Sequence, residues 1–236
     1  ESSPAGLLDR ALSYSNALRP SDAVRLLETA RRQGVRHASV DSALIRLLVI
    51  WRAGRATEAA ALLEAATAAA PMARELLETR VWLGLSVALK VATPEVAAAF
   101  SGLDVRADLH LLRRSAGESS EERIALFEAM LQVRVAFADG GPNDGDPPPP
   151  EVERALDAVS RVLARFPDSR DAATLAFAAA WMLLGPYKGT VRASEIVTKS
   201  GSERTRELRR FLVACMDAGQ GVRQAEPTLG ERIAVI

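Results

Sequence analysis

The side chains that most often do chemistry are few in this sequence and lie far apart. A single cysteine, Cys215, excludes an internal disulfide and a thiolate metal cluster, and it is expected to be a small buried apolar residue. The two histidines, His37 and His110, have no histidine or glutamate at the spacing of a metal-binding helix. The sequence also lacks a phosphate loop, a dinucleotide fingerprint and a serine nucleophile elbow. We therefore expect no catalytic residues, no cofactor and no metal, and predict that the chain is not an enzyme.

Arginine clusters are the next candidates for chemistry, because guanidinium groups bind phosphate. They comprise Arg31, Arg32 and Arg36, and the arginines between 204 and 210. The nearby glutamates Glu28, Glu203 and Glu207 stand at helical spacing, which predicts ion pairs within each helix instead. The 30 basic residues are balanced by 30 acidic ones, and only 5% of the residues are aromatic. We therefore expect no nucleic-acid partner.

The aspartates between 139 and 146 could suggest a calcium loop. Counting from Asp139, position 12 is Pro150, where a calcium loop of the EF-hand type requires glutamate. Four successive prolines follow the aspartates, and no apolar side chain interrupts the segment. The sequence therefore predicts a flexible surface loop over 139–149.

The elements that would position any site are predicted to be helices throughout. The chain has 236 residues, of which 43 are alanine, the best helix former, and it shows no convincing run of alternating apolar and polar residues. We predict an all-α fold of about 11–12 helices, including helices over 190–199 and 203–218, with residues 185–189 as a connector. The most apolar stretch, 174–184, is about half the length needed to cross a bilayer, so no membrane insertion is expected.

A repeated set of residues organises these helices. Ala59, Leu63 and Ala66 are followed by Pro71, and the same small, large, small order occurs 36 residues earlier. Small residues let paired helices approach, the large residue fills the space between them, and proline prevents the helix from continuing. The other copies are Ala23, Leu27 and Ala30; Val96, Phe100 and Leu103, preceded by Leu83-Gly84; Ala155, Val159 and Val162, followed by Pro167; and Ala193, Val197 and Ser200.

This pattern resembles the tetratricopeptide repeat family, in divergent form. The resemblance implies a right-handed α-solenoid of antiparallel helix pairs over 1–218, with an irregular middle unit, and it leaves 219–236 as a tail. In such arrays the first helices of the pairs line a concave groove that binds other molecules. The predicted partner-binding residues on those first helices are Asp41, Leu44, Leu48, Trp51, Arg52, Glu78, Val81 and Leu85.

The expected function is that of a non-enzymatic scaffold or adaptor that binds a protein or peptide through this groove. The alanine- and arginine-rich composition is typical of a high-GC bacterium, so we expect a bacterial assembly, secretion or signalling complex. The alternative is a regulatory or sensory domain of a longer bacterial kinase or transcription regulator. A cytoplasmic location is favoured, and a periplasmic or lipid-anchored one stays open because the chain does not begin with methionine. The oligomeric state is left open.

Overall fold

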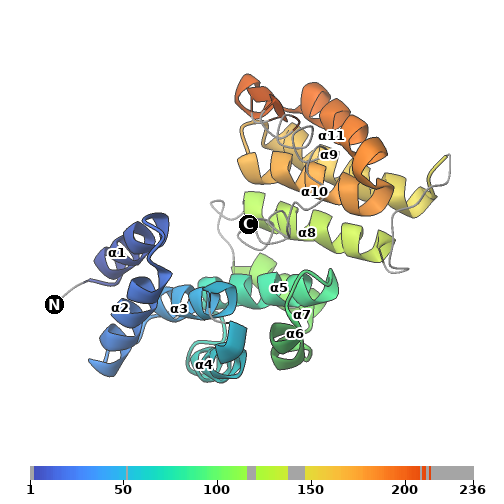
Figure 1. Ribbon diagram of the computed structural model, residues 1–236. Coiled ribbons are helices and arrows are strands. Elements are labelled where there is room, and N and C mark those ends of the chain that lie inside the picture. Colours follow the sequence, from blue (N-terminus) through green and yellow to red (C-terminus); the bar gives the residue numbers. More distant parts are fainter. Residues whose placement is uncertain are drawn as a thin grey trace. The chain divides into compact units, whose positions relative to one another are not determined.

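The computed structural model describes residues 3–51, 53–115, 121–137 and 147–207, together with 209, 210 and 213. Within these ranges the regular secondary structure is entirely helical, with helices α1 to α11, one 3-10 turn and a further helical segment over 203–207, which confirms the predicted all-α class. The chain divides into two compact units, Glu1–Ala116 and Gly117–Ile236, called unit 1 and unit 2 here (Figure 1). A single repeat domain over 1–218 stays a prediction.

Unit 1 consists of helices that pack in sequential pairs. Helix α1 packs on α2 and α3 on α4, while α5 packs on α7 and on the short α6. Contacts also join the first helices of successive pairs, α1 to α3 and α3 to α5, and they join α4 to α6. The bounds are α1 Pro4–Asn16, α2 Pro20–Arg32, α3 Ala38–Trp51, the 3-10 turn η1 Ala53–Arg55, α4 Ala56–Ala69, α5 Arg74–Ala88, α6 Pro94–Phe100 and α7 Val105–Ser115.

Local sequence explains where several of these helices begin and end. The hydroxyl of Ser3 accepts a hydrogen bond from the backbone N–H of Gly6 at 3.2 Å, and Pro4 occupies the first position of α1. Thr93 and Pro94 start α6 in the same way. After α2 the chain turns at Gly34, whose φ of 92° favours glycine, so the predicted helix end at this residue is confirmed.

The predicted small-residue positions lie at the helix contacts of unit 1. Ala23 and Ala59 are fully buried, and Leu27 and Leu63 beside them are buried as well. Gly84 on α5 shows how close the packing is, because a Cβ atom at this position would lie 2.5 Å from Val105 Cγ2 on α7. The burial of the repeated residues is consistent with their predicted place between packed helices.

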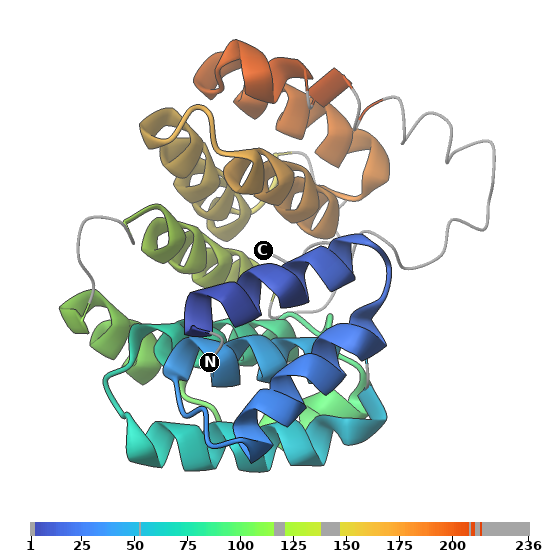
Figure 2. The ribbon, with the colours of Figure 1, turned by 90° about the vertical axis from the view of Figure 1, so that its left-hand side faces the viewer.

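Unit 2 contains two helical hairpins. Helix α8, Glu121–Ala136, packs on α9, Pro150–Arg165, and α10, Arg170–Leu184, packs on α11, Pro186–Ser200. Further contacts join α8 to α10, α9 to α10 and α9 to α11, so α9 and α10 lie between α8 and α11 (Figure 2). Five of the six repeat residues of this unit are buried, namely Ala155, Val159, Val162, Ala193 and Val197, whereas Ser200 is only partly buried.

The start of α11 corrects one prediction. Residues 185–189 were expected to form a connector, but Gly185 alone makes the turn, with a φ of 76°, and Pro186 begins the helix at once. Gly189 then lies inside α11 against α10, where a Cβ atom would be 2.6 Å from the carbonyl oxygen of Ala180. The glycine that suggested a loop thus serves close helix packing. The predicted helix over 203–218 is seen at 203–207, and the predicted loop 139–149 and tail 219–236 lie largely or wholly outside the described residues.

Candidate functional site

The candidate site is a surface groove of about 590 Å³ on unit 1, between α2 and α4. One side is formed by α2 and the turn after it, the other side by α4, and one residue of α3 contributes to the floor. The lining residues are Glu28, Arg31, Arg32, Arg36, Leu44, Glu58, Ala61, Leu62 and Ala65.

Helical spacing places these side chains on facing surfaces. Glu28 and Arg32 are four residues apart on α2 and therefore lie on one face. On α4 the lining positions 58, 61, 62 and 65 follow the same three- and four-residue spacing. Leu44 and Leu62 are buried beneath the groove, whereas Ala61 and Ala65 are exposed. The groove thus combines an apolar floor with charged edges.

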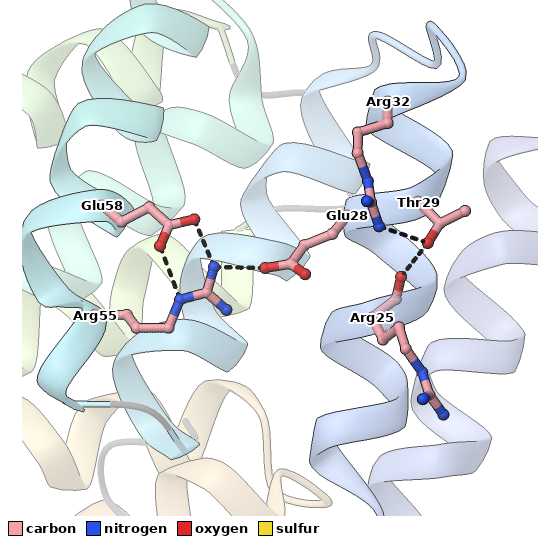
Figure 3. A network of polar contacts seen from close by, with 6 residues as sticks. All are labelled: Arg25, Glu28, Thr29, Arg32, Arg55 and Glu58. Carbon is pink, nitrogen blue, oxygen red and sulfur yellow. Dashed lines mark hydrogen bonds and ion pairs between the residues drawn. The ribbon is translucent and has the colours of Figure 1, made fainter.

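A guanidinium group joins the two sides of the groove at one end. Arg55, immediately before α4, donates from Nη2 to Glu28 Oε1 at 2.6 Å and to Glu58 Oε1 at 2.6 Å, and from Nε to Glu58 Oε2 at 2.8 Å (Figure 3). The hydrogen bond from Arg55 lowers the pKa of Glu58. The pKa of the Arg55 guanidinium is raised mainly by its hydrogen bonds to Glu58, and further by its hydrogen bond to Glu28. Both acidic side chains of the groove therefore share one arginine as their ion-pair partner, and its single positive charge balances only one of the two carboxylates.

Arg31 makes the second charge contact at the groove. Its Nε atom lies 2.6 Å from Asp41 Oδ1 on α3, close enough for an ion pair but without hydrogen-bond geometry. Asp41 is buried, with 6% of its surface exposed. Because a buried carboxylate needs a compensating charge, Arg31 is committed to this contact.

Arg32 and Arg36 differ from the other two arginines of the groove. Arg32 Nη2 donates to Thr29 Oγ1 at 3.2 Å, and Thr29 Oγ1 in turn donates to the carbonyl oxygen of Arg25 at 2.7 Å (Figure 3). Arg36 Nη1 donates to the carbonyl oxygen of Arg31 at 2.6 Å, at the end of α2. Within the described part of the chain, neither guanidinium has a carboxylate partner. Both side chains belong to exposed residues.

These contacts correct the predicted pairing of the first arginine cluster. Glu28 does not pair with the arginines of its own helix, because Arg55 reaches it from the start of α4. The second cluster agrees better with the prediction, since Glu203 lies 3.7 Å from Arg206 and 3.9 Å from Arg210.

The eight residues predicted to line a partner-binding groove fall into separate environments. Leu44, Leu48, Val81 and Leu85 are core residues with at most 2% exposure, and Leu44 among them also lies at the base of the α2–α4 groove. Glu78 is also buried and lies 2.9 Å from Arg74 Nε on its own helix, while Asp41 pairs with Arg31.

Trp51 is the one exposed member of the predicted set that the structure describes. It ends α3 with 48% of its surface exposed, an unusual position for a large aromatic side chain. Arg52, the next residue, lies outside the described residues. Partner binding through these two residues stays a prediction.

Unit 2 carries a second hollow of about 520 Å³ beside the turn between α9 and α10. Its lining mixes three arginines with three carboxylates, and burial, followed by the charge of Glu122, raises the pKa of Asp171 there. Because both signs of charge share this hollow, it favours no one kind of ligand. The lining residues are Glu122, Arg165, Phe166, Pro167, Asp168, Ser169, Arg170, Asp171 and Arg204.

Neither of the two histidines is among the residues that line the two hollows. His37 is exposed, with Nδ1 2.6 Å from Ser39 Oγ, and His110 is exposed on α7. Cys215 lies outside the described residues. In the part of the chain that the structure describes, no three histidine, cysteine or acidic side chains are grouped to hold a metal ion.

The fold and these contacts define an all-helical protein whose helices pack in sequential pairs, an arrangement consistent with a helical repeat. No protein-family model, curated protein or solved structure matches the chain. Among the helices of the described residues, none has both the length and the hydrophobicity to cross a bilayer.

Proposed function

We propose that this chain is a non-enzymatic scaffold, built like a divergent tetratricopeptide array, that holds a peptide or protein surface against its helix pairs. The observation that carries this proposal is the α2–α4 groove, where an apolar floor adjoins two guanidinium groups that have no carboxylate partner among the described residues. Protein interfaces use this combination of apolar area and arginine.

The packing supports the proposal in a second way. Stacked helix pairs present long surfaces between successive helices, and such surfaces bind extended partners without any reactive group. Repeated small residues such as Ala23 and Ala59 are buried in unit 1. The first helices of successive pairs also contact each other, α1 with α3 and α3 with α5, as in a stack of helix pairs.

Trp51 offers a second contact point for a partner. Tryptophan and arginine contribute disproportionately to the binding energy of protein interfaces, and Trp51 is half exposed at the end of α3. In the proposed scaffold, the exposed Trp51 is a point of contact with the partner in addition to the α2–α4 groove. The right-handed solenoid with a concave face belongs to the same proposal.

Site-specific photo-crosslinking in an extract of the source cells tests this function. A photoreactive side chain at position 51 or 61 is expected to form covalent adducts with a defined protein. The same side chain at Val135, an exposed residue of unit 2, is the control and should not capture that protein. Trp51→Ala and Arg52→Glu should then weaken capture without changing helicity measured by circular dichroism. Absence of protein adducts at both positions 51 and 61 would contradict the scaffold function.

A further inference from the structure

Resting on the proposed scaffold function, we infer that the α2–α4 groove binds an acidic peptide segment of a partner protein. Its carboxylates pair with Arg32 and Arg36, and an apolar side chain of the segment packs on the floor between α2 and α4. The inference depends on the charges of the groove, on the fixed positions of the two guanidinium groups and on the small side chains of α4.

The charges of the groove leave a cationic end. Glu28 and Glu58 are both bound by Arg55, and Asp41 is paired with Arg31. Arg32 and Arg36 therefore remain as the two groove cations without an acidic partner in the described ranges. A ligand that supplies carboxylates at this end completes the pairing.

Hydrogen bonds hold the two guanidinium groups in place but use only part of their N–H donors. Arg36 donates from Nη1 to the carbonyl oxygen of Arg31, which fixes it over the end of α2, and Arg32 donates from Nη2 to Thr29. A guanidinium has five N–H donors, so each arginine retains donors for a bidentate contact with a carboxylate. Because the side chains are already positioned, less conformational entropy is lost on binding.

The floor suits a peptide rather than a small ion. Ala61 and Ala65 are exposed on α4, one turn apart, and their methyl side chains allow a peptide backbone to come close. Leu44 and Leu62 lie at the base of the groove and provide apolar contact. The ligand is therefore expected to carry an apolar residue next to its acidic ones.

The opposite end of the groove disfavours a nucleic-acid backbone. Glu28 and Glu58 stand there, and a continuous row of phosphates would bring negative charge against both carboxylates. A peptide avoids this repulsion by placing an uncharged or basic residue at that end. The groove lining also contains no aromatic side chain on which a base could stack.

The test uses the full chain on an array of short synthetic peptides that vary in acidic content and leucine position. Acidic peptides containing leucine are expected to bind, and their amide counterparts, with glutamine for glutamate and asparagine for aspartate, should not. The charge reversal Arg32→Glu with Arg36→Glu should weaken binding at least about tenfold in fluorescence polarisation. The matched control is Arg106→Glu, because Arg106 is an exposed arginine of unit 1 outside the groove lining, and it should bind as the unaltered chain does.

Three results would overturn the inference. Equal peptide binding by the double variant and by Arg106→Glu would show that the peptide does not contact Arg32 and Arg36. Tighter binding of single-stranded DNA or inorganic phosphate than of any peptide would show that the groove binds a different ligand. No binding of acidic peptides, with protein adducts still formed at position 51, would refute the acidic ligand while leaving the scaffold function intact. Unchanged circular dichroism of the double variant shows that its loss of binding is not a loss of fold.

Discussion

Arg55 Nη2 lies 2.6 Å from Glu28 Oε1, and this contact joins the start of α4 to α2, 27 residues earlier in the chain. Arg55, the last residue of η1, also binds Glu58 on α4, so one guanidinium holds a carboxylate from each side of the groove. The contact limits how far α2 and α4 can separate at this end. It therefore ties the stability of the helix pairs to the shape of the candidate site.

Replacing Arg55 tests this connection. Arg55→Gln is expected to lower the free energy of unfolding by about 1 kcal/mol, because exposed ion pairs contribute little individually and this residue makes two of them. The loss should shrink at high salt, which screens exposed charges. Urea unfolding at low and high salt measures both effects.

The control for this prediction is Arg106→Gln, which removes an exposed arginine outside the groove and should change stability by less than about 0.5 kcal/mol. A double-mutant cycle with Glu28→Gln adds a direct readout of the interhelical pair. If the effects of Arg55→Gln and Glu28→Gln were fully additive, the contact would contribute nothing to stability.

Gly84 provides a test of the close approach between α5 and α7. Gly84→Ala places a methyl group 2.5 Å from Val105 Cγ2, so a side chain must move. Overpacking costs about 1–3 kcal/mol, and the better helix propensity of alanine returns up to about 1 kcal/mol. We expect a net loss of stability in urea unfolding, with faster amide hydrogen exchange in α5 and α7.

Two companion variants isolate the steric cause at Gly84. Val105→Ala removes the colliding methyl group, and in that background Gly84→Ala should become stabilising by about 1 kcal/mol. Gly54→Ala is the matched control, because a Cβ atom there meets nothing within 4 Å. A stabilising effect of Gly84→Ala in the otherwise unaltered chain would show that α5 and α7 are not packed this closely.

Substituting alanine at Gly189 should lower the stability more than at Gly84, because the atoms nearest to Gly189 belong to the backbone. A Cβ atom at Gly189 would lie 2.6 Å from the carbonyl oxygen of Ala180 and 2.8 Å from Trp181 Cα, both of which are backbone atoms. Backbone cannot rotate away as a side chain can, so α11 as a whole must shift. We expect Gly189→Ala to cost about 3 kcal/mol or more.

Hydrogen exchange locates the effect of Gly189→Ala, since amides of α10 and α11 should lose protection while those of unit 1 do not. No single side-chain truncation should rescue this variant, in contrast to the Gly84 pair. A smaller loss of stability than that of Gly84→Ala would contradict the reported approach of α11 to α10.

Helical spacing predicted much of the architecture because it acts within one segment. Ala23, Ala59 and Ala155 could be assigned to helix contacts from their repeated positions, and all three are fully buried. Helical spacing was a poorer guide to which side chains are exposed, because exposure depends on the other helices that pack around each helix. Leu48 and Val81 were assigned to an open groove, yet both are core residues, because a stacked helix contacts neighbours on several sides.

The candidate site could be predicted only in part. The arginine cluster at the end of α2 was found from the sequence. The partner of Glu28 was not, because Arg55 follows it by 27 residues and is brought close only by the folding of the chain. The sequence does show that Arg55 and Glu58 are three residues apart at the start of α4, which is a local signal of this network. Gly189 was misassigned because glycine marks both loops and close helix contacts.

Asp108 gives a pH-dependent prediction within unit 1. Its Oδ1 atom accepts a hydrogen bond from Arg80 Nε at 2.8 Å, which joins α7 to α5, while its Oδ2 atom is buried without a hydrogen-bond partner. Burial raises the pKa of Asp108 above its ordinary value of 3.8, and Arg80 opposes this effect only partly. The folded chain therefore binds the Asp108 proton more tightly than the unfolded chain does.

The sign of the pH dependence follows from that difference. Well below pH 3.8 the side chain is protonated in both states and carries no penalty, and as the pH rises through the elevated pKa the folded state must bury a charge. The free energy of unfolding of the unaltered chain, minus that of Asp108→Asn, should therefore fall over this range and stay constant above it. In an Arg80→Gln background the fall should be larger and extend to higher pH, because the guanidinium that lowers the folded-state pKa of Asp108 is gone. Urea unfolding from acidic to neutral pH measures both curves, and a difference that rises with pH would show that the Arg80 contact outweighs burial.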